Sequence, residues 1–492
     1  MRIITAEYEI ITPMYLGGAN QQPDWRISSY ANVLRWWWRA LAYARFNGDL
    51  RALRVNEALL FGRHEKGFGA GRVRFRDVSK AEAEVDAPVG WQIGTGVGNP
   101  WGGWSGLSYL AGQGLKGRTP LKRNRVAVEL RIAWRDTSKL AGNLREFENG
   151  TICLDTLRDA VKLIGLLGGL GARSRRAFGS LSLCSLEIDE KDEMPTLATV
   201  DDYKTAIYEA IGENVNWPPN GDGEVPFSAF CEQTQVVVVG TGDSSHELMN
   251  LLGWGLQYYR SWGQPKRATC TVGGQQKQVR GGGHYVQFKH AGSSKEIAPL
   301  RCAGSTSLFQ FTDDHTWYDE VGSGKNTIDE TFIRHPVRAV FGLPQNYRGV
   351  AKVDATNAHD PSKSDCWGAK PKNGVYPLRH ETRIEVNVLK EYNNKTTHNR
   401  RASPLFLHIA KIGNSYAAVC TLLQSEFLPQ GIPIKVTRKI AKKHYEPNQN
   451  PDWSAITGFI EFVSAGNHIV EELPGPAKEA ACWRRINIVG PS

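Results

Sequence analysis

Three consecutive tryptophans, Trp36–Trp38, stand between Arg35 and Arg39 in this chain. Adjacent side chains point about 100° apart on a helix and to opposite faces on a strand, so three indoles in a row cannot share one face. The segment therefore has to place its indoles in more than one environment. Which indole lies in a core, and what the flanking arginines contact, limits the folds that this chain can adopt.

Helical periodicity separates two faces of this segment. An apolar stripe recurs at steps of four, three and four residues: Tyr30, Leu34, Trp37 and Leu41. A polar stripe lies two residues earlier, about 200° around the helix: Ser28, Asn32, Arg35 and Arg39. We therefore expect a helix from Ser28 or Ser29 to about Phe46, with Trp37 in the core. Trp36 and Trp38 lie at the flanks, either buried under loops or stacked on a base or a partner subunit.

The polar stripe is a candidate surface for phosphates. Arg26 adds a cation just before the helix, where the helix dipole already favours anions. The candidate RNA-binding residues of this region are Arg26, Asn32, Arg35, Trp38 and Arg39.

A second stretch, Gly165–Leu183, combines glycines with three arginines and follows a predicted helix. It lacks the lysine of a Walker phosphate loop, and Ser174 stands where a dinucleotide-binding loop has its last glycine. Glycines let backbone amides approach a phosphate chain, and arginines bind phosphates bidentately. The predicted nucleic-acid contacts are Arg173, Ser174, Arg175, Arg176 and Phe178. The alternative is a tight helix-to-strand connection with solvated arginines.

Two further stretches interleave basic and aromatic or glycine residues. Gly94–Arg125 is interpreted as a long functional loop, with Lys116 and Arg118 as candidate RNA contacts. Gly273–His290 is its counterpart later in the chain. The candidate contacts there are Lys277 and Arg280. A loop can also be basic because it is exposed, so both interpretations stand.

Length and charge distribution indicate two basic bodies. A chain of 492 residues is long for one hydrophobic core, so two domains are expected. The net charge is +10 over residues 1–188, −8 over residues 189–224 and +8 over residues 225–492. Basic domains favour a polyanionic partner such as nucleic acid. We predict an N-terminal domain at 1–188, an acidic linker with one short helix at 189–226, and a C-terminal domain at 227–492.

The order of predicted elements indicates an α+β fold. Besides the helix from Ser28, the first domain contains four predicted strands and a second helix. The strands are Ile3–Thr12, Arg72–Val78, Val126–Trp134 and Ser180–Ile188, and the helix is Leu154–Leu167. This β-α-β-β-α-β order is the ferredoxin-like, RRM-like pattern. A weaker echo after Pro226 predicts two such domains in tandem, each with a long Gly-rich loop.

Catalytic and metal-binding patterns are scarce. His64 lies in a Gly-rich turn and is the one candidate general base for metal-free RNA cleavage. The eight cysteines are scattered singly, which favours reduced thiols over disulfides or zinc. We expect no cofactor and no metal. No apolar run approaches the ~20 residues of a membrane span, and Met1–Ile10 lacks signal-peptide features, so a cytoplasmic protein is expected.

Several motifs in order resemble a known family. They are "TPMYLGGANQ", "RISSYANVLRWWWRAL", "ALLFG" and the glycine-rich core formed by Gly169, Gly171, Arg173, Ser174, Arg175, Arg176, Gly179 and Ser180. Together they resemble the RAMP superfamily of CRISPR proteins, and more closely the first-numbered Cmr subunits of type III-B effector complexes. One departure is that Ala31 and Asn32 stand where the family often has Lys-Gly, so a phosphate-binding lysine is missing there.

This resemblance implies two tandem RAMP domains and a non-catalytic RNA-binding subunit in antiviral defence. It implies guide (CRISPR) RNA, target RNA and other Cmr or RAMP subunits as partners, and no membrane. The subunit would cap the end of the complex near the 3′ part of the guide RNA and contact the RNA backbone, leaving sequence to base pairing. The alternative is a RAMP endoribonuclease that matures guide RNA, with His64 as general base.

Overall fold

The structure is a computed structural model, and the chain in it forms two compact units. It describes residues 1–17, 22–65, 68–80, 106–115, 118–133, 145–212, 225–262, 267–272, 275–282, 285–288, 296–299, 337–343, 345–350, 381–388, 391–392, 395–396, 401–427, 434–438, 443–445, 453–466 and 481–489. The first unit spans 1–254, 405–426 and 463–492, and the second spans 255–404 and 427–462. Within the described residues, no helix has the length and apolar character needed to cross a membrane.

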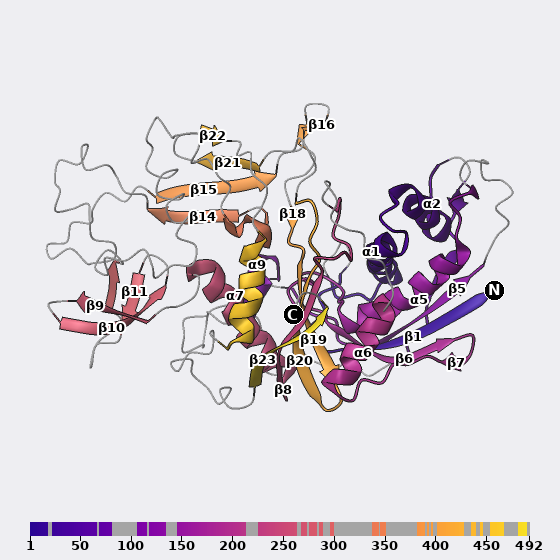
Figure 1. Ribbon diagram of the computed structural model, residues 1–492, viewed down its shortest axis with the longest axis horizontal. Helices are drawn as coiled ribbons and strands as arrows, with labels where there is room; N and C mark the ends of the chain where they lie inside the picture. Colours follow the sequence, from indigo (N-terminus) through magenta and orange to yellow (C-terminus); the bar gives the residue numbers. More distant parts are fainter. Residues whose placement is uncertain are drawn as a thin grey trace. The chain divides into compact units, whose positions relative to one another are not determined.

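A five-stranded antiparallel sheet in the first unit has the order β4-β5-β1-β6-β7. Its strands are β1 (Arg2–Ile10), β4 (Val73–Asp77), β5 (Arg125–Ile132), β6 (Leu181–Ile188) and β7 (Lys191–Asp192). Ile4, Ala6 and Tyr8 of β1 are buried, whereas the residues between them are partly exposed. The helices α1 (Ile27–Arg45) and α5 (Gly150–Leu166) cover the buried face (Figure 1). The first repeat (β1, α1, β4, β5, α5 and β6) therefore has the predicted order.

Additional elements decorate this first repeat. They are α2 (Leu50–Phe61), β2 (Gly62–Arg63), β3 (Gly69–Ala70), α3 (Gly106–Ala111), the 3-10 helix η1 (Gly112–Leu115) and α6 (Val200–Ile211). The predicted order did not include α2, whose first turn is capped by the side chain of Asp49. The expected loop over Gly94–Arg125 contains α3 and η1, while its residues 94–105 and 116–117 lie outside the described residues. No side chain caps α1, and Arg26 rather than a serine stands at the N-cap.

A four-stranded antiparallel sheet, β19-β20-β8-β23, repeats the same plan. Its elements are β8 (Gln235–Gly242), α7 (Ser245–Trp262), β19 (Leu405–Ile412), β20 (Ser415–Leu422), α9 (Ser454–Ser464) and β23 (Ala481–Val489). In this second repeat, as in the first, the first strand lies between the third and fourth, and the second strand lies beside the third. Helices combined with antiparallel sheets confirm the α+β prediction.

One face of the second repeat's sheet belongs to the core of the first unit. All four valines of β8, Val236–Val239, are buried, as expected for a strand covered on both faces. Val236 and Val238 lie in the same hydrophobic cluster as Trp37, together with Phe406 of β19. The two larger sheets of the first unit therefore pack through their side chains and share no strand.

The acidic segment predicted as a linker packs on the first repeat through its short helix. The predicted helix exists as α6, with a capping box formed by Thr199 and Asp202. It is packed rather than linking, because Tyr203 is buried and donates a hydrogen bond to the Leu166 carbonyl of α5. Arg45 at the end of α1 also donates to the Ala210 carbonyl. Residues 213–224 lie outside the described residues.

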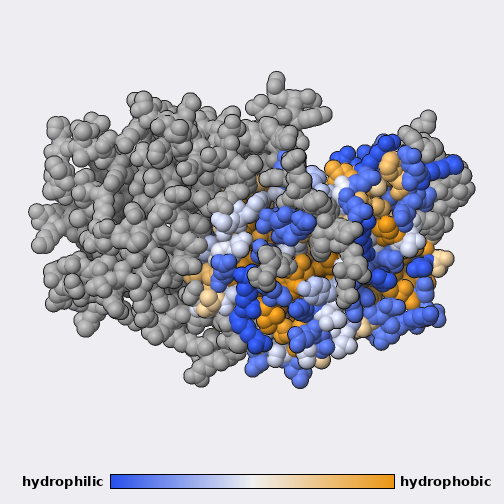
Figure 2. All heavy atoms as spheres, viewed as in Figure 1, coloured by the Kyte–Doolittle hydropathy of each residue, from blue (hydrophilic) through white to orange (hydrophobic). Residues whose placement is uncertain are grey.

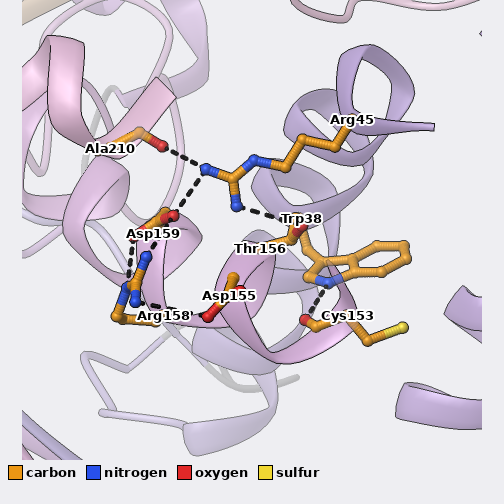
Figure 3. A network of polar contacts seen from close by, with 8 residues as sticks. All are labelled: Trp38, Arg45, Cys153, Asp155, Thr156, Arg158, Asp159 and Ala210. Atoms are coloured by element: carbon orange, nitrogen blue, oxygen red, sulfur yellow. Dashed lines mark hydrogen bonds and ion pairs between the residues drawn. The ribbon is translucent and has the colours of Figure 1, made fainter. Parts of the chain in front are cut away.

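A buried ion-pair network holds α1, α5 and α6 together (Figure 3). Asp159, buried on α5, accepts hydrogen bonds from Arg45 at 2.6 Å and from Arg158 at 2.7 Å. Arg45 also donates to the Thr156 hydroxyl. Because each charge in the interior has a partner of opposite sign, the network avoids the large penalty of an unpaired buried charge.

The second unit contains further antiparallel sheets and an aromatic cluster. Its remaining elements are β9 (Arg267–Val272), β10 (Gln275–Gly282), β11 (Tyr285–Phe288), β12 (Glu296–Pro299), η5 (Val337–Phe341), β13 (Gly342–Leu343), β14 (Gln345–Val350), β15 (Glu381–Val388), β16 (Glu391–Tyr392), β17 (Lys395–Thr396), β18 (Arg401–Ala402), β21 (Ile434–Arg438) and β22 (Lys443–Tyr445). Tyr259 of α7 contacts the rings of Phe341, Phe459 and Phe462 at centroid distances of 5.5–6.2 Å.

Candidate nucleic-acid interface

The three tryptophans of α1 divide between core and boundary. Trp37 is 2% exposed and lies in the core, as the periodicity predicts. Trp38 is 0% exposed, and its indole nitrogen donates to the Cys153 carbonyl at 3.2 Å. The prediction that Trp38 stacks on RNA is therefore wrong, because α5 covers its ring and satisfies its only donor. Trp36 is half-buried against Phe406 of β19, with ring centroids 5.0 Å apart.

The two arginines that flank the tryptophans point to α2. Arg35 Nε lies 2.5 Å from Glu57 Oε1, and Arg39 reaches both carboxylate oxygens of Glu57. Burial by itself raises the pKa of Glu57, but hydrogen bonds from Arg39 and Arg35 outweigh it and lower that pKa. The prediction that this stripe faces outward is thus wrong in part. Each arginine side chain is 36% exposed, but its guanidinium neutralises a nearly buried carboxylate.

The Gly/Arg loop, which we define as residues 168–180, is held by hydrogen bonds to the segment that follows β1, residues 12–15. Ala172 N donates to the Tyr15 carbonyl and Gly179 N to the Pro13 carbonyl, at 2.9 and 3.0 Å. The Thr12 hydroxyl donates to the Ala177 carbonyl at 2.6 Å and accepts from Ser180 N at 2.8 Å. These contacts fix a segment that contains little regular structure of its own.

The same loop stores backbone strain. Arg173 and Ala177 have φ values of 65° and 64°, in the left-handed region that non-glycine residues seldom occupy. Gly171 is required at φ 93°, because a Cβ there would lie 2.8 Å from the Tyr15 carbonyl oxygen. Strained residues of this kind concentrate at functional sites, where the surrounding structure holds them in place.

Arg175 fastens the loop to the second repeat. Its guanidinium carbon lies 4.5 Å from the centroid of Phe406 and 5.4 Å from that of Trp36, which are cation–π distances. Its carbonyl accepts a hydrogen bond from Leu407 N of β19 at 3.1 Å. Arg176 forms a parallel bridge with Leu407, so the loop lies along the edge of β19. Arg175 therefore has a structural role, since it attaches the Gly/Arg loop to β19.

Arg173 faces a different neighbour, η1, and is exposed. A Cβ built on Gly112 or Gly114 would lie 3.0 or 3.3 Å from its Nη2 atom, so the guanidinium lies against the η1 backbone. Arg118 follows η1 and is close enough to Tyr15 to oppose the rise that burial causes in the Tyr15 pKa. The structure thus brings together two stretches predicted separately, the Gly/Arg loop and the segment around Arg118.

The remaining predicted contacts are spread more widely. Phe178 is 1% exposed and packs edge-on against Tyr15, so the prediction that it contacts nucleic acid is wrong. Ser174 is half-buried in the loop, and Asn32 is exposed on α1. Arg26 is exposed and pairs with Asp24 at 3.0 Å. Lys116 lies outside the described residues, and for Lys277 and Arg280 on β10 the structure describes the strand but not the side chains.

His64 lies in the β2–β3 hairpin, exposed and next to the Arg63–Glu65 ion pair. The described residues contain no group of His, Cys, Asp and Glu that could hold a metal ion.

The open face of the first sheet is charged rather than aromatic. Arg125 pairs with Glu7 at 3.0 Å, and Arg131 with Glu129 at 2.7 Å. Lys411 of β19 reaches Glu9 at 2.7 Å. The described strand residues of this face include no aromatic ring on which a base could stack, so the face lacks the stacking platform of an RRM sheet. Figure 2 shows that the visible described surface combines hydrophilic residues with several hydrophobic areas.

Sequence reasoning missed Glu57, Phe406, Gly112 and Gly114. Glu57 has a local signal, since it lies inside an apolar helix where a carboxylate needs a cationic partner. The other three have none, because their roles depend on segments far away in the chain.

Comparison with known proteins finds similarity within the first repeat. Residues 7–182 match the RAMP superfamily. A curated relative, the CRISPR system Cmr subunit Cmr1-2 of Pyrococcus furiosus, is 28% identical over 180 residues, which cover 36% of this chain and 92% of that subunit. The resemblance found in the sequence is therefore confirmed.

Two solved structures are also similar over most of their length. The crystal structure of Cmr1 from Pyrococcus furiosus (apo form) has a TM-score of 0.46 at 15% identity, covering 100% of this chain and 99% of that one. A cryo-EM structure of the type III-B Cmr-beta bound to cognate target RNA has a chain with a TM-score of 0.43 at 10% identity, covering 95% of this chain and 100% of that one.

Proposed function

We propose that this chain is a non-catalytic RNA-binding subunit of a type III-B CRISPR (Cmr) RNA-guided effector complex. Its partners are guide RNA, target RNA and other Cmr or RAMP subunits, and it caps the end near the 3′ part of the guide. The match of residues 7–182 to the RAMP superfamily and the similarity to a Cmr subunit support the family context.

We further propose that the chain contains two tandem ferredoxin-like RAMP domains, 1–188 and 227–492. The two sheets support this proposal because they place their strands in the same order around the same sequence of elements. The close packing of the second sheet on the first repeat explains why the compact units do not follow this division.

The observation that carries the RNA-binding role is the Gly/Arg loop. Its backbone is hydrogen-bonded to the segment that follows β1, it holds Arg173 in a left-handed conformation, and Arg173 is exposed. A preorganised, exposed arginine binds a phosphate with less loss of conformational entropy than a mobile one. The contact is to the backbone of the RNA, because a single guanidinium on a loop reads charge rather than sequence.

Salt-dependent RNA binding tests this role. The full chain is titrated with a fluorescein-labelled single-stranded RNA over a series of NaCl concentrations, and fluorescence anisotropy gives Kd. Phosphate contacts make log affinity fall linearly with log salt, so a steep slope is expected. Incorporation into the complex without any salt-dependent RNA affinity contradicts the proposal and supports a scaffold that binds protein alone.

The endoribonuclease alternative has a direct test. His64→Ala is compared with the wild-type chain in cleavage of a precursor guide RNA without metal. We expect no cleavage by either protein. Cleavage by the wild type that the substitution abolishes overturns the non-catalytic proposal.

A further inference from the structure

The strand β4 carries two exposed arginines, Arg74 and Arg76, on the open face of the first sheet. Val73 and Phe75 alternate with them and pack into the core, so the two arginines share the opposite face. Residues two apart on a strand are separated by about 7 Å, so the two side chains start close together. Among the described residues β4 pairs with β5 alone, so these arginines lie at an edge of the sheet.

The arginines of β4 differ from the neighbouring cation on β5, because they lack a carboxylate partner. Arg131 pairs with Glu129 at 2.7 Å. Within the part of the chain that the structure describes, Arg74 and Arg76 make no ion pair, hydrogen bond or ring contact. The register places Arg76 opposite Glu129, whose carboxylate Arg131 already occupies. The edge of the face therefore carries two positive charges that no side chain compensates.

The register also places Arg74 directly opposite Arg131, which is unfavourable for the sheet itself. Like charges directly opposite each other on antiparallel strands destabilise the pair, because their side chains start about 5 Å apart. Glu129 brings one negative charge to three guanidinium groups. A bound anion would supply the compensation that the fold leaves out.

We propose that Arg74 and Arg76 form a second phosphate contact for RNA, separate from the Gly/Arg loop. This proposal rests on the proposed RNA-binding function and extends it to another part of the same sheet. Guanidinium groups bind phosphates bidentately, and residues 1–188 carry a net charge of +10, which favours a polyanion. The described strand residues of this face include no aromatic ring, so the contact is to the RNA backbone and leaves the bases unread.

The two contacts lie at opposite ends of β1. The β5 residue opposite Arg74, Arg131, pairs with Ile3 near the start of β1, whereas the Gly/Arg loop bonds to residues 12–15 beyond its end. β1 has nine residues and is about 30 Å long. One phosphate cannot reach both places, so an RNA strand that meets both has to run along the sheet.

Arg74→Gln with Arg76→Gln is the principal test, because glutamine keeps a polar side chain and removes both charges. The full chain and the variant are titrated with the labelled single-stranded RNA over the NaCl series. We expect binding to weaken about five- to tenfold and the salt slope to fall by about 1.4, which corresponds to two phosphates.

Arg54→Gln with Lys191→Gln is the matched control. It removes two other exposed charges, on α2 and β7, that likewise have no partner among the described residues. This control should keep the wild-type affinity and salt slope. Wild-type affinity of the β4 variant, or an equal loss in the control, overturns the proposal and leaves the proposed function standing.

Arg74→Glu separates binding from folding. It places a carboxylate opposite Arg131, so an attractive pair replaces a repulsive one and Tm should rise. We expect weaker RNA binding by this better-folded variant, which a loss of structure cannot explain. Wild-type RNA binding combined with failure to join the complex would assign the arginines to an acidic protein surface and overturn the proposal. A wild-type chain without salt-dependent RNA affinity overturns both this proposal and the proposed function.

Discussion

The two repeats have the same order of elements but different chemistry at the same place in that order. After α5, the segment 167–180 carries three arginines and no acidic residue. After α9, the corresponding segment 467–480, which lies outside the described residues, carries three glutamates and one lysine. The same place in the order of elements therefore carries a basic sequence in the first repeat and an acidic one in the second, and only the basic one suits the proposed phosphate contact.

The second repeat instead supports the core and the Gly/Arg loop of the first repeat. The face of its sheet that carries Phe406 packs into the core around Trp37, and the edge of β19 lies along the Gly/Arg loop. In the first repeat the face opposite the helices stays open and polar. The second repeat thus holds the Gly/Arg loop of the first repeat in its conformation. The following substitutions test whether the two repeats divide support and RNA binding in this way.

Phe406→Ala should have the largest effect. The ring contacts Trp36, Trp37 and Arg175, so its loss should lower the free energy of unfolding by about 3–5 kcal/mol and also weaken RNA binding. Urea unfolding and RNA titration measure the two effects. Phe459→Ala, a truncation of a fully buried ring in the second unit, is the control with comparable destabilisation but unchanged RNA affinity. Equal RNA affinity of both variants would show that Phe406 does not support the Gly/Arg loop for RNA binding.

Arg35→Ala with Arg39→Ala should come second. The double substitution leaves the Glu57 carboxylate nearly buried without its partners, which we expect to cost about 2–3 kcal/mol of stability in urea unfolding. Adding Glu57→Leu should restore most of it, since no unpaired charge then remains. The triple variant should bind RNA like the wild type. Weaker RNA binding by this stable variant would instead support the phosphate-binding role that the sequence predicts for Arg35 and Arg39.

The buried side chain of His408 on β19 should make the folded protein less stable at low pH. Burial lowers the pKa of His408 from 6.5 to about 3, while a backbone group of Gly168 acts in the opposite direction. Neither ring nitrogen makes a well-formed hydrogen bond among the described residues. The folded state therefore keeps the ring neutral. Its contribution to the free energy of unfolding is fully present above about pH 6.5 and is lost as the pH falls toward 3.

The expected loss from this one proton is about 2 kcal/mol at pH 5, at about 1.4 kcal/mol per pH unit. Thermal unfolding of the wild type and His408→Leu from pH 7.5 to pH 5 measures it. The variant should lose less stability over this range, because leucine has no proton to gain. Parallel pH profiles of the two proteins would show that His408 is not the group responsible.

Arg173→Gly should have the smallest effect on stability, and of opposite sign. Glycine accepts the left-handed φ without strain, so we expect a gain of up to about 1 kcal/mol together with weaker RNA binding. Ala177→Gly relieves the same kind of strain at a buried position and should leave RNA binding unchanged. Differential scanning calorimetry and RNA titration separate the two outcomes. A loss of stability in Arg173→Gly would mean that the arginine is mainly structural.

Much of the first repeat is predictable because its signals are local. The alternation in β1 and the stripe through Trp37 each reflect burial of one face, which a period of two or 3.6 residues records directly. The same reasoning could not rank Trp36 and Trp38, which are symmetrical about Trp37. Only the packing of α5 on one side and β19 on the other distinguishes them.

The candidate site was predictable in composition but not in the roles of its residues. Glycine and arginine in Gly165–Leu183 indicated phosphate binding, yet they did not show that Arg175 and Arg173 point to different neighbours. Phe178 looks accessible in a glycine-rich loop, but Tyr15 covers it. These errors share one cause: the partner that decides each residue's role lies in a segment far away along the chain.

The sequence by itself determined the local elements, the basic character of the Gly/Arg loop and the resemblance to the RAMP superfamily, because these depend on residue type and short-range spacing. The tertiary structure alone decided that Trp38 is buried, that Arg35 and Arg39 neutralise Glu57, and that Arg173 lies on Gly112 and Gly114. The physical reason is that burial and charge pairing are properties of surfaces brought together in space, and folding joins surfaces whose separation along the chain leaves no local pattern.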